Sequence, residues 1–320
     1  MGIFESTAPA AAAGNTPPVR VSTRSRFCPR RSQADLILVL VSLLWGVMFV
    51  IAKEALDDVS AVLYLTLRFT VAAVALAILF GARLRGGFSG KETCTGILLG
   101  AVLMIGYLLQ TIGLAYTTPA KSAFLTGSYV IAVPFFGWLV YRIRPRLPEV
   151  LGVSLTGLGI ALLSTQGETI RIGRGEVLTI GCAIAFAAHI VMLGKVAPKF
   201  HFANLSFLQL SAAAVFAAIA LPLLETPVLR WRPMVVMAIF AGGLLATALA
   251  FVVQTWAQQF TTPTRAALIF SLEPVFAVLA AWLWRGELLT GYSACGAALI
   301  LGGVLLVELK PAGDCQHPSS

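Results

Sequence analysis

Residues 110–123 read QTIGLAYTTPAKSA, and residues 254–267 read QTWAQQFTTPTRAA. Both stretches begin with Gln-Thr and contain Thr-Thr-Pro seven residues later, so they are related by a constant shift of 144 residues. The same shift places Lys121 on Arg265. An internal repeat has to be recognised first, because it determines the architecture of the whole chain.

The repeat continues toward the N-terminus with a shift of 141 residues. This shift carries Asp35 onto Glu176 and Arg68 onto Gln209. Both copies lie in strongly apolar sequence. Two similar apolar halves are typical of transporters that are built from internal repeats.

Composition places the chain in the membrane class. Of its 320 residues, 58% are hydrophobic and 12% are charged, whereas a soluble domain has about 25% charged residues. The net charge of +9 comes from loops and the N-terminal tail, so it indicates membrane orientation, and nucleic acid is not expected as a partner. The five cysteines and three histidines show no metal-ligand spacing, so we expect no metal site and no cofactor.

Ten segments are long and apolar enough to span a membrane, which takes about 20 residues each. Pro119 and Pro263 suit the first turn of the fourth and ninth spans, because a proline there loses no needed hydrogen bond. The ten predicted spans are residues 35–54, 60–81, 93–116, 119–141, 147–165, 175–195, 203–224, 233–258, 263–284 and 288–309.

The distribution of basic residues predicts the orientation. With the N-terminus inside, fifteen Lys and Arg residues lie on the cytoplasmic side and seven on the other, and Arg68 lies within a span. This excess predicts a multi-pass protein of the cytoplasmic membrane with both termini cytoplasmic. The halves, residues 34–166 and 174–310, hold five spans each, so the second half enters the membrane from the opposite side. The predicted fold is therefore all-α and integral to the membrane, with ten transmembrane helices as two inverted five-helix repeats.

Both ends of the chain are expected to lie outside the bundle. Residues 1–33 are rich in Ala, Pro, Ser and Arg, which predicts a disordered basic cytoplasmic tail. A myristoylation pattern at Met1-Gly2 and an organelle transit peptide stay open as alternatives. Residues 311–320 form a C-terminal tail.

Motifs in both halves carry a resemblance to a known family. The chain resembles the ten-span EamA-type members of the drug/metabolite transporter superfamily over residues 35–310. The resemblance implies the ten-span fold and the transport of a small metabolite, without naming the solute. Its motifs are Leu43-Leu44-Trp45-Gly46 with Phe49 and Lys53, Arg68-Phe69, residues 113–125, residues 271–277, Gly286-Glu287, and Gly296 with Gly302-Gly303.

Motifs of enzymes and ATP-driven pumps are missing from the sequence. Residues 89–92 read SGKE and lack the glycine spacing of a phosphate-binding loop. No catalytic triad pattern or carboxylate pair occurs, so we expect no catalytic residues. Transport must then be facilitated, or coupled to a proton, another ion or a counter-solute.

Charged residues within a span are the best pointers to a site, because each costs about 2.5–3.5 kcal/mol to insert. Glu273 lies near the middle of the ninth span, next to the helix-breaking Pro274, and aligns with Tyr129 in the repeat. Its carboxylate could bind a substrate ammonium group, carry a proton, or pair with a neighbouring group. Arg68 could bind a substrate carboxylate or lock two helices together.

Polar uncharged residues extend the candidate site. Gln110 and Gln254 are repeat-equivalent, and Tyr107 precedes Gln110 by one helical turn. These amides suit a polar or amphipathic solute, although hydrogen bonds between helices would also explain them. His189, in the sixth span, could line a cavity or form a structural hydrogen bond.

Aromatic residues of the first span complete the candidate site. Trp45 and Phe49 lie one turn apart and share a face. They could form an aromatic wall of the substrate cavity, or pack against lipid or a neighbouring helix.

Small residues indicate where helices approach closely. Gly152 and Gly159, in the fifth span, map onto Gly296 and Gly303 in the tenth. Both spans carry few polar side chains, so we assign them to a scaffold or to a homodimer contact.

The combined pattern predicts a secondary transporter that moves a small organic metabolite by alternating access. From the resemblance to the EamA-type family we expect an amino acid or related solute as the cargo and export as the direction. A membrane-embedded enzyme and a non-transporting membrane scaffold remain the alternatives.

Overall fold

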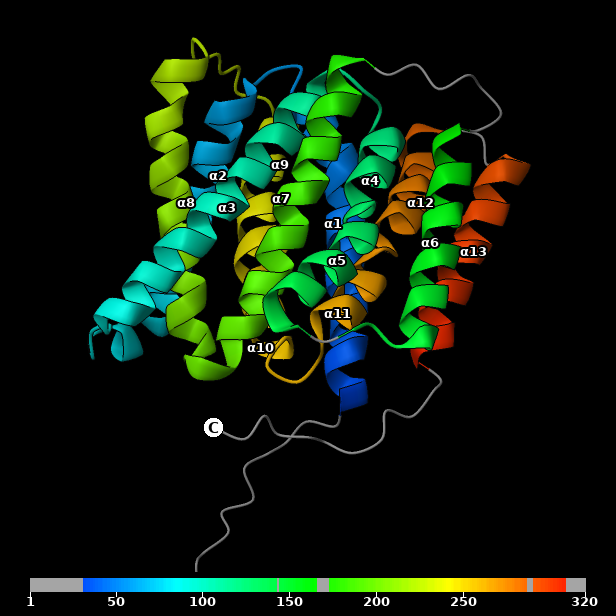
Figure 1. Cartoon of the computed structure of the whole chain (residues 1–320). Coiled ribbons are helices and arrows are strands. Elements are labelled where there is room, and N and C mark those ends of the chain that lie inside the picture. The colour runs from blue at the N-terminus through cyan, green and yellow to red at the C-terminus, as the bar shows by residue number, and fades with distance from the viewer. Residues whose placement is uncertain (1–30, 143, 166–172, 287–289, 309–320) are drawn as a thin grey trace, which may run out of the picture.

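The computed structural model describes residues 31–142, 144–165, 173–286 and 290–308. This part of the chain forms one bundle of helices (Figure 1). The predicted disordered N-terminal tail and the C-terminal tail fall almost entirely outside the described residues. The helices are α1 (Arg31–Ala55), α2 (Ala61–Leu84), α3 (Gly90–Ala115), α4 (Pro119–Gly127), α5 (Tyr129–Tyr141), α6 (Leu147–Thr165), α7 (Arg174–Val196), α8 (Phe202–Leu224), α9 (Pro233–Gly243), α10 (Ala250–Ala257), α11 (Pro263–Phe270), α12 (Glu273–Arg285) and α13 (Gly291–Glu308).

All ten predicted spans are present within the described residues. Eight are long and apolar enough to cross a membrane by themselves, and two shorter apolar helices, α6 and α13, complete the ten. Large apolar side chains such as Ile78, Leu223 and Leu283 are 74–79% exposed on the outside of the bundle, where lipid can cover them. The all-α membrane fold of two inverted five-helix repeats is confirmed. The repeat boundaries 34–166 and 174–310 stay predictions.

Each end of the bundle carries one copy of the repeated turn. The turn at Thr118 joins α3 to α4 at one end, and the turn at Thr262 joins α10 to α11 at the other (Figure 1). We call these the Thr118 end and the Thr262 end. In both turns the threonine hydroxyl accepts a hydrogen bond of 3.3 Å from the backbone N–H three residues later, and a proline follows the threonine. The two turns are therefore built by the same capping interaction.

An ion pair joins the two halves at each end. At the Thr118 end, Lys121 Nζ lies 2.8 Å from a carboxylate oxygen of Glu176. At the Thr262 end, the guanidinium of Arg265 lies 3.8 Å from a carboxylate oxygen of Asp35. The residues of one pair are the repeat equivalents of the residues of the other, so the pseudo-two-fold axis exchanges the two ion pairs.

Three spans depart from a continuous α-helix. The ninth span is broken between α11 and α12, immediately before Glu273 and Pro274, where the proline predicted a break. The fourth span is broken at Ser128, the equivalent position in the first half, where the sequence shows no proline nearby. The eighth span contains a π-helical stretch, Leu244–Leu249, between α9 and α10.

Glycines let α6 and α13 cross at very short range. A Cβ added to Gly303 would lie 2.6 Å from the carbonyl oxygen of Gly152, and one added to Gly159 would lie 2.6 Å from that of Gly296. The repeat exchanges these two contacts, so the crossing is symmetric about the pseudo-two-fold axis. The two helices thus pack tightly against each other, while their assignment to a scaffold or to a homodimer contact stays a prediction.

Candidate functional site

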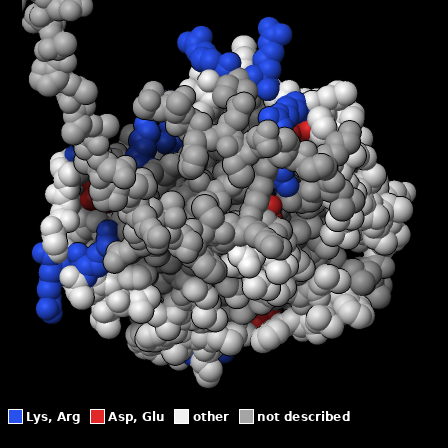
Figure 2. Space-filling view, turned by 90° about the horizontal axis from the view of Figure 1, so that it is seen from below, with Lys and Arg blue, Asp and Glu red and all other residues white. Residues whose placement is uncertain are grey.

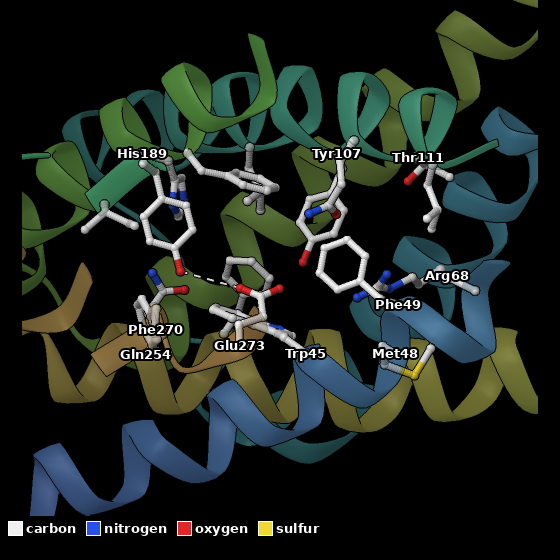
Figure 3. Close-up of a pocket in the computed structure, with 18 of the residues that line it drawn as sticks. Trp45, Met48, Phe49, Arg68, Tyr107, Thr111, His189, Gln254, Phe270 and Glu273 are labelled. Carbon is white, nitrogen blue, oxygen red and sulfur yellow. Dashed lines mark hydrogen bonds between the residues drawn. The ribbon is translucent and has the colours of Figure 1, made fainter. Parts of the chain in front are cut away.

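A cavity lies between the two halves of the bundle. Its walls come from α1, α2, α3 and α5 of the first half and from α7, α10, α11 and α12 of the second (Figure 3). Aromatic and apolar side chains form most of the wall, with a few polar groups among them. This composition is typical of small-molecule sites.

The structure brings together every site residue that the sequence singled out. That these residues bind a solute stays a prediction. All nine line the cavity: Trp45, Phe49, Arg68, Tyr107, Gln110, Tyr129, His189, Gln254 and Glu273.

Sequence reasoning missed several other lining residues, among them Tyr64, Thr111 and Phe186. Phe186 is the repeat equivalent of Trp45, so the shift of 141 residues could have found it. Tyr64 precedes Arg68 by one helical turn, which puts both on the same face of α2. Thr111 belongs to the repeated Gln-Thr pair, which marked the repeat but was not taken as a sign of a site.

Trp45 forms a fixed wall of the cavity. Its indole Nε1–H donates a 2.8 Å hydrogen bond to the carbonyl oxygen of Ala246. Its ring centre lies 5.0 Å from that of Phe270 and 5.6 Å from that of Phe251, both in tilted arrangements. The polar and apolar parts of this side chain are both held, so its ring keeps one orientation.

Arg68 is anchored by the π-helical stretch of the eighth span. Its Nε donates to the Thr247 hydroxyl at 2.7 Å, and its Nη2 donates to the Ala246 carbonyl at 3.3 Å. The guanidinium carbon lies 5.0 Å from the centre of the Tyr107 ring, within cation–π range. Arg68 therefore locks two helices together, as one interpretation of the sequence held, and it also lines the cavity.

His189 belongs to a chain of hydrogen bonds whose directions can be worked out. The Thr255 hydroxyl donates to the Phe251 carbonyl at 2.6 Å, so its oxygen accepts from Gln209 Nε2 at 3.1 Å. The Gln209 carbonyl oxygen then faces His189 Nε2 at 2.9 Å, and that ring nitrogen must be the donor. His189 forms structural hydrogen bonds and also lines the cavity, so both readings of this residue describe it.

The two repeat-equivalent glutamines have different partners. Gln110 Nε2 donates to the Thr126 hydroxyl at 3.3 Å. Gln254 Nε2 donates to Gln258 Oε1 at 3.3 Å, and its own carbonyl oxygen is buried without a partner among the described residues. Position 258 corresponds to Leu114 in the first half, which cannot hold the Gln110 amide in the same way.

Glu273 lies on the pseudo-two-fold axis. Its carboxylate accepts a hydrogen bond of 3.5 Å from the hydroxyl of Tyr129, its own repeat equivalent (Figure 3). Two positions that the axis exchanges can meet only close to that axis. Glu273 is 5% exposed. Because the axis exchanges the Thr118 end and the Thr262 end, this buried carboxyl group lies midway between them.

The cavity itself is not symmetric. It extends toward the Thr118 end as far as Ala52 and Leu114, near the ends of α1 and α3. The repeat equivalents of these residues, Leu193 and Gln258, do not line it and are at most 1% exposed. Gln258 Nε2 also bonds to the Ile190 carbonyl at 3.1 Å. Toward the Thr262 end the bundle is therefore closed at Leu193 and Gln258, whereas their repeat equivalents line the cavity toward the Thr118 end.

Ten spanning helices in two inverted halves around a central cavity define a membrane transporter built from internal repeats. The family model of the EamA-like transporter family matches the chain twice, over residues 32–165 and 173–309. The chain belongs to the EamA-like transporter family.

Individual proteins agree with this assignment over most of their length. An uncharacterized transporter of Archaeoglobus fulgidus is 34% identical over 282 residues, covering 88% of this chain and 87% of that protein. A probable terminal-alkyne amino-acid exporter of Streptantibioticus cattleyicolor is 26% identical over 299 residues, covering 90% and 98%. A solved crystal structure with 20% identity superposes with a TM-score of 0.73, covering 87% of this chain and 98% of that one, and so shares the fold.

Proposed function

We propose that the protein is a secondary transporter that exports an amino acid or a related small metabolite across the cytoplasmic membrane by alternating access. The observation that carries the proposal is the cavity between the halves, where a guanidinium at Arg68 and a carboxyl group at Glu273 face an apolar, aromatic space. A zwitterion with an apolar side chain is complementary to such a wall. The similarity to a probable amino-acid exporter supports the same class of cargo.

The charge distribution supports an orientation with both termini in the cytoplasm. Figure 2 looks onto the Thr262 end, where Lys and Arg side chains stand at several places around the rim. Nine described Lys and Arg side chains belong to loops and helix ends on this side, and five to the Thr118 end. The more basic side is expected to face the cytoplasm. Reporter fusions at residues 20 and 315 should both give a cytoplasmic signal, and a signal from the opposite side at either position would overturn the orientation.

The unequal ends of the cavity support alternating access. Each half can adopt the arrangement of the other, because the two share one architecture in opposite orientations. In the second state the closed positions of the Thr262 end would open and those of the Thr118 end would close. The central carboxyl group keeps its place in both states, since it lies on the axis.

Glu273 is the group expected to bind the solute's ammonium or to carry a coupled proton. Glu273→Gln keeps the shape of the side chain and removes its charge. We expect this variant to fold, and to lose flux or the pH dependence of flux when purified protein is reconstituted into proteoliposomes with radiolabelled solutes. Tyr129→Phe is the matched control, because it removes the hydrogen bond to Glu273 and keeps the carboxyl group. Unchanged flux of Glu273→Gln at every pH would rule out the functional role of the carboxylate.

A further inference from the structure

Gln258 determines the orientation of the Gln254 amide, that is, which of its two terminal atoms bonds to Gln258 and which stays unbonded. The main-chain oxygen of Ile190 can only accept hydrogen bonds, so the group 3.1 Å from it must be the amide nitrogen of Gln258. The Gln258 oxygen is then the atom that faces Gln254, at 3.3 Å, and it accepts from the Gln254 nitrogen. This chain of donors and acceptors leaves the oxygen of Gln254 as an acceptor without a donor among the described residues.

Gln254 lines the cavity, and its unpaired oxygen is buried. Gln254 is 1% exposed, and its Oε1 has no hydrogen-bond partner among the described residues. A buried acceptor without a donor costs free energy unless a ligand supplies the donor. In Figure 3 the Gln254 amide is turned toward the carboxyl group of Glu273 on the same side of the cavity.

These two groups together require a particular ligand chemistry. A carboxylate and an amide oxygen are both acceptors, so a group that satisfies both must bring at least two hydrogens, and a positive charge strengthens the bond to the carboxylate. A primary ammonium group has three donors and no acceptor, whereas a hydroxyl has one hydrogen.

We propose that Gln254 Oε1 and the Glu273 carboxylate form an ammonium-binding subsite, and that Gln258 is the positioning residue that keeps an acceptor facing it. The proposal rests on the proposed transport function and adds the basis of its selectivity: the protein takes amine-bearing solutes in preference to the matching hydroxy compounds. The repeat does not duplicate this subsite, because Tyr129 stands at the position of Glu273 and Leu114 at that of Gln258.

The test compares amino acids with their hydroxy acid analogues. The probes are L-leucine and 2-hydroxy-4-methylpentanoate, and L-phenylalanine and 3-phenyllactate, each measured by binding to purified protein and by flux in proteoliposomes. We expect the wild-type protein to prefer the amine of each pair by about tenfold or more, the effect of one charge-assisted hydrogen bond. Gln258→Leu, which installs the residue found at the equivalent position, should reduce this preference to about the same degree.

A neighbouring glutamine supplies the matched control. Gln259 bonds to the main-chain oxygens of Ala197 and Phe200 and does not line the cavity, so Gln259→Leu should keep the wild-type preference. If Gln258→Leu fails to fold, Gln254→Leu tests the same oxygen directly and should show the same loss.

The outcomes separate the subsite from the transport function. Equal binding of amine and hydroxy compounds by the wild type, or an unchanged preference in both Gln258→Leu and Gln254→Leu, overturns the subsite. Flux of a hydroxy acid without discrimination overturns the subsite and leaves transport standing. Selective binding of the amine without any flux supports the subsite and overturns transport. Neither binding nor flux of any probe overturns both.

Discussion

Adding one methyl group at the crossing of α6 and α13 should destabilise the protein measurably. In Gly303→Ala the new carbon would lie 2.6 Å from the Gly152 carbonyl oxygen and would also touch the Thr156 hydroxyl. Non-bonded heavy atoms prefer about 3.5–4.0 Å, so the helices have to separate. Overpacking of this kind costs about 1–3 kcal/mol, whereas alanine gains about 1 kcal/mol over glycine in helix propensity.

The neighbouring glycine isolates the steric part of this effect. A Cβ on Gly302 meets nothing within 4 Å, so Gly302→Ala has the gain in helix propensity without the clash. The two variants should therefore differ by about 1–3 kcal/mol in free energy of unfolding. At about 2–4 °C per kcal/mol in a protein of roughly this size, Gly302→Ala should unfold about 2–12 °C above Gly303→Ala.

Thermal unfolding in detergent, followed by the loss of helical circular dichroism, measures the difference. Flux per folded molecule should stay near the wild-type value in both variants, because the two halves contribute equally to this crossing in either state. Equal melting temperatures would refute the tight crossing. A normal melting temperature with lost flux would refute its symmetric, structural role.

Two further predictions concern groups at the ends of the bundle. Lys121→Met should lower the free energy of unfolding by about 0.2–1 kcal/mol, as expected for a partly exposed ion pair. Glu176→Ala should lower it by about 0.5–2 kcal/mol more, because Glu176 also accepts hydrogen bonds from the backbone of Gly173 and from Thr117. Equal melting temperatures of the two variants would contradict this. His201 Nδ1 accepts from the backbone of α8, and partial burial, followed by the charge of Arg83, lowers its pKa from the ordinary value despite an opposing effect of Glu92. The neutral cap therefore contributes stability above about pH 6.5 that is lost as the pH falls below it, and His201→Asn, which keeps a cap without titrating, should remove this part of the pH dependence of the melting temperature.

The sequence was sufficient to predict the spans and the inverted repeat, because both depend on local hydrophobicity and on similarity between the halves. The helix break before Pro274 was predictable from the missing backbone donor. The equivalent break at Ser128 was not, because Val130 stands where the proline would be. The sequence also did not predict the π-helical stretch. Its Ala246 carbonyl accepts hydrogen bonds from Trp45 and Arg68, which belong to helices distant in sequence.

The candidate site was predictable to a similar degree. Charged and amide side chains within apolar spans marked the cavity, because such groups are costly to place against lipid. Their separate roles were not predictable. Whether Gln254 offers an oxygen or a nitrogen to the cavity depends on the main-chain oxygen of Ile190, which no sequence pattern locates.

The hydrogen bond between Tyr129 and Glu273 shows what a single chain of two fused repeats permits and a homodimer does not. In a homodimer of two inverted five-span chains, every residue at the axis meets its own copy. Two glutamates there would repel each other in a nonpolar setting, and two tyrosines would provide no charge. Once a duplication joins the halves in one chain, each position can change alone. Gene fusion thereby permits a single carboxyl group at the centre of the molecule, beside a hydroxyl that donates to it.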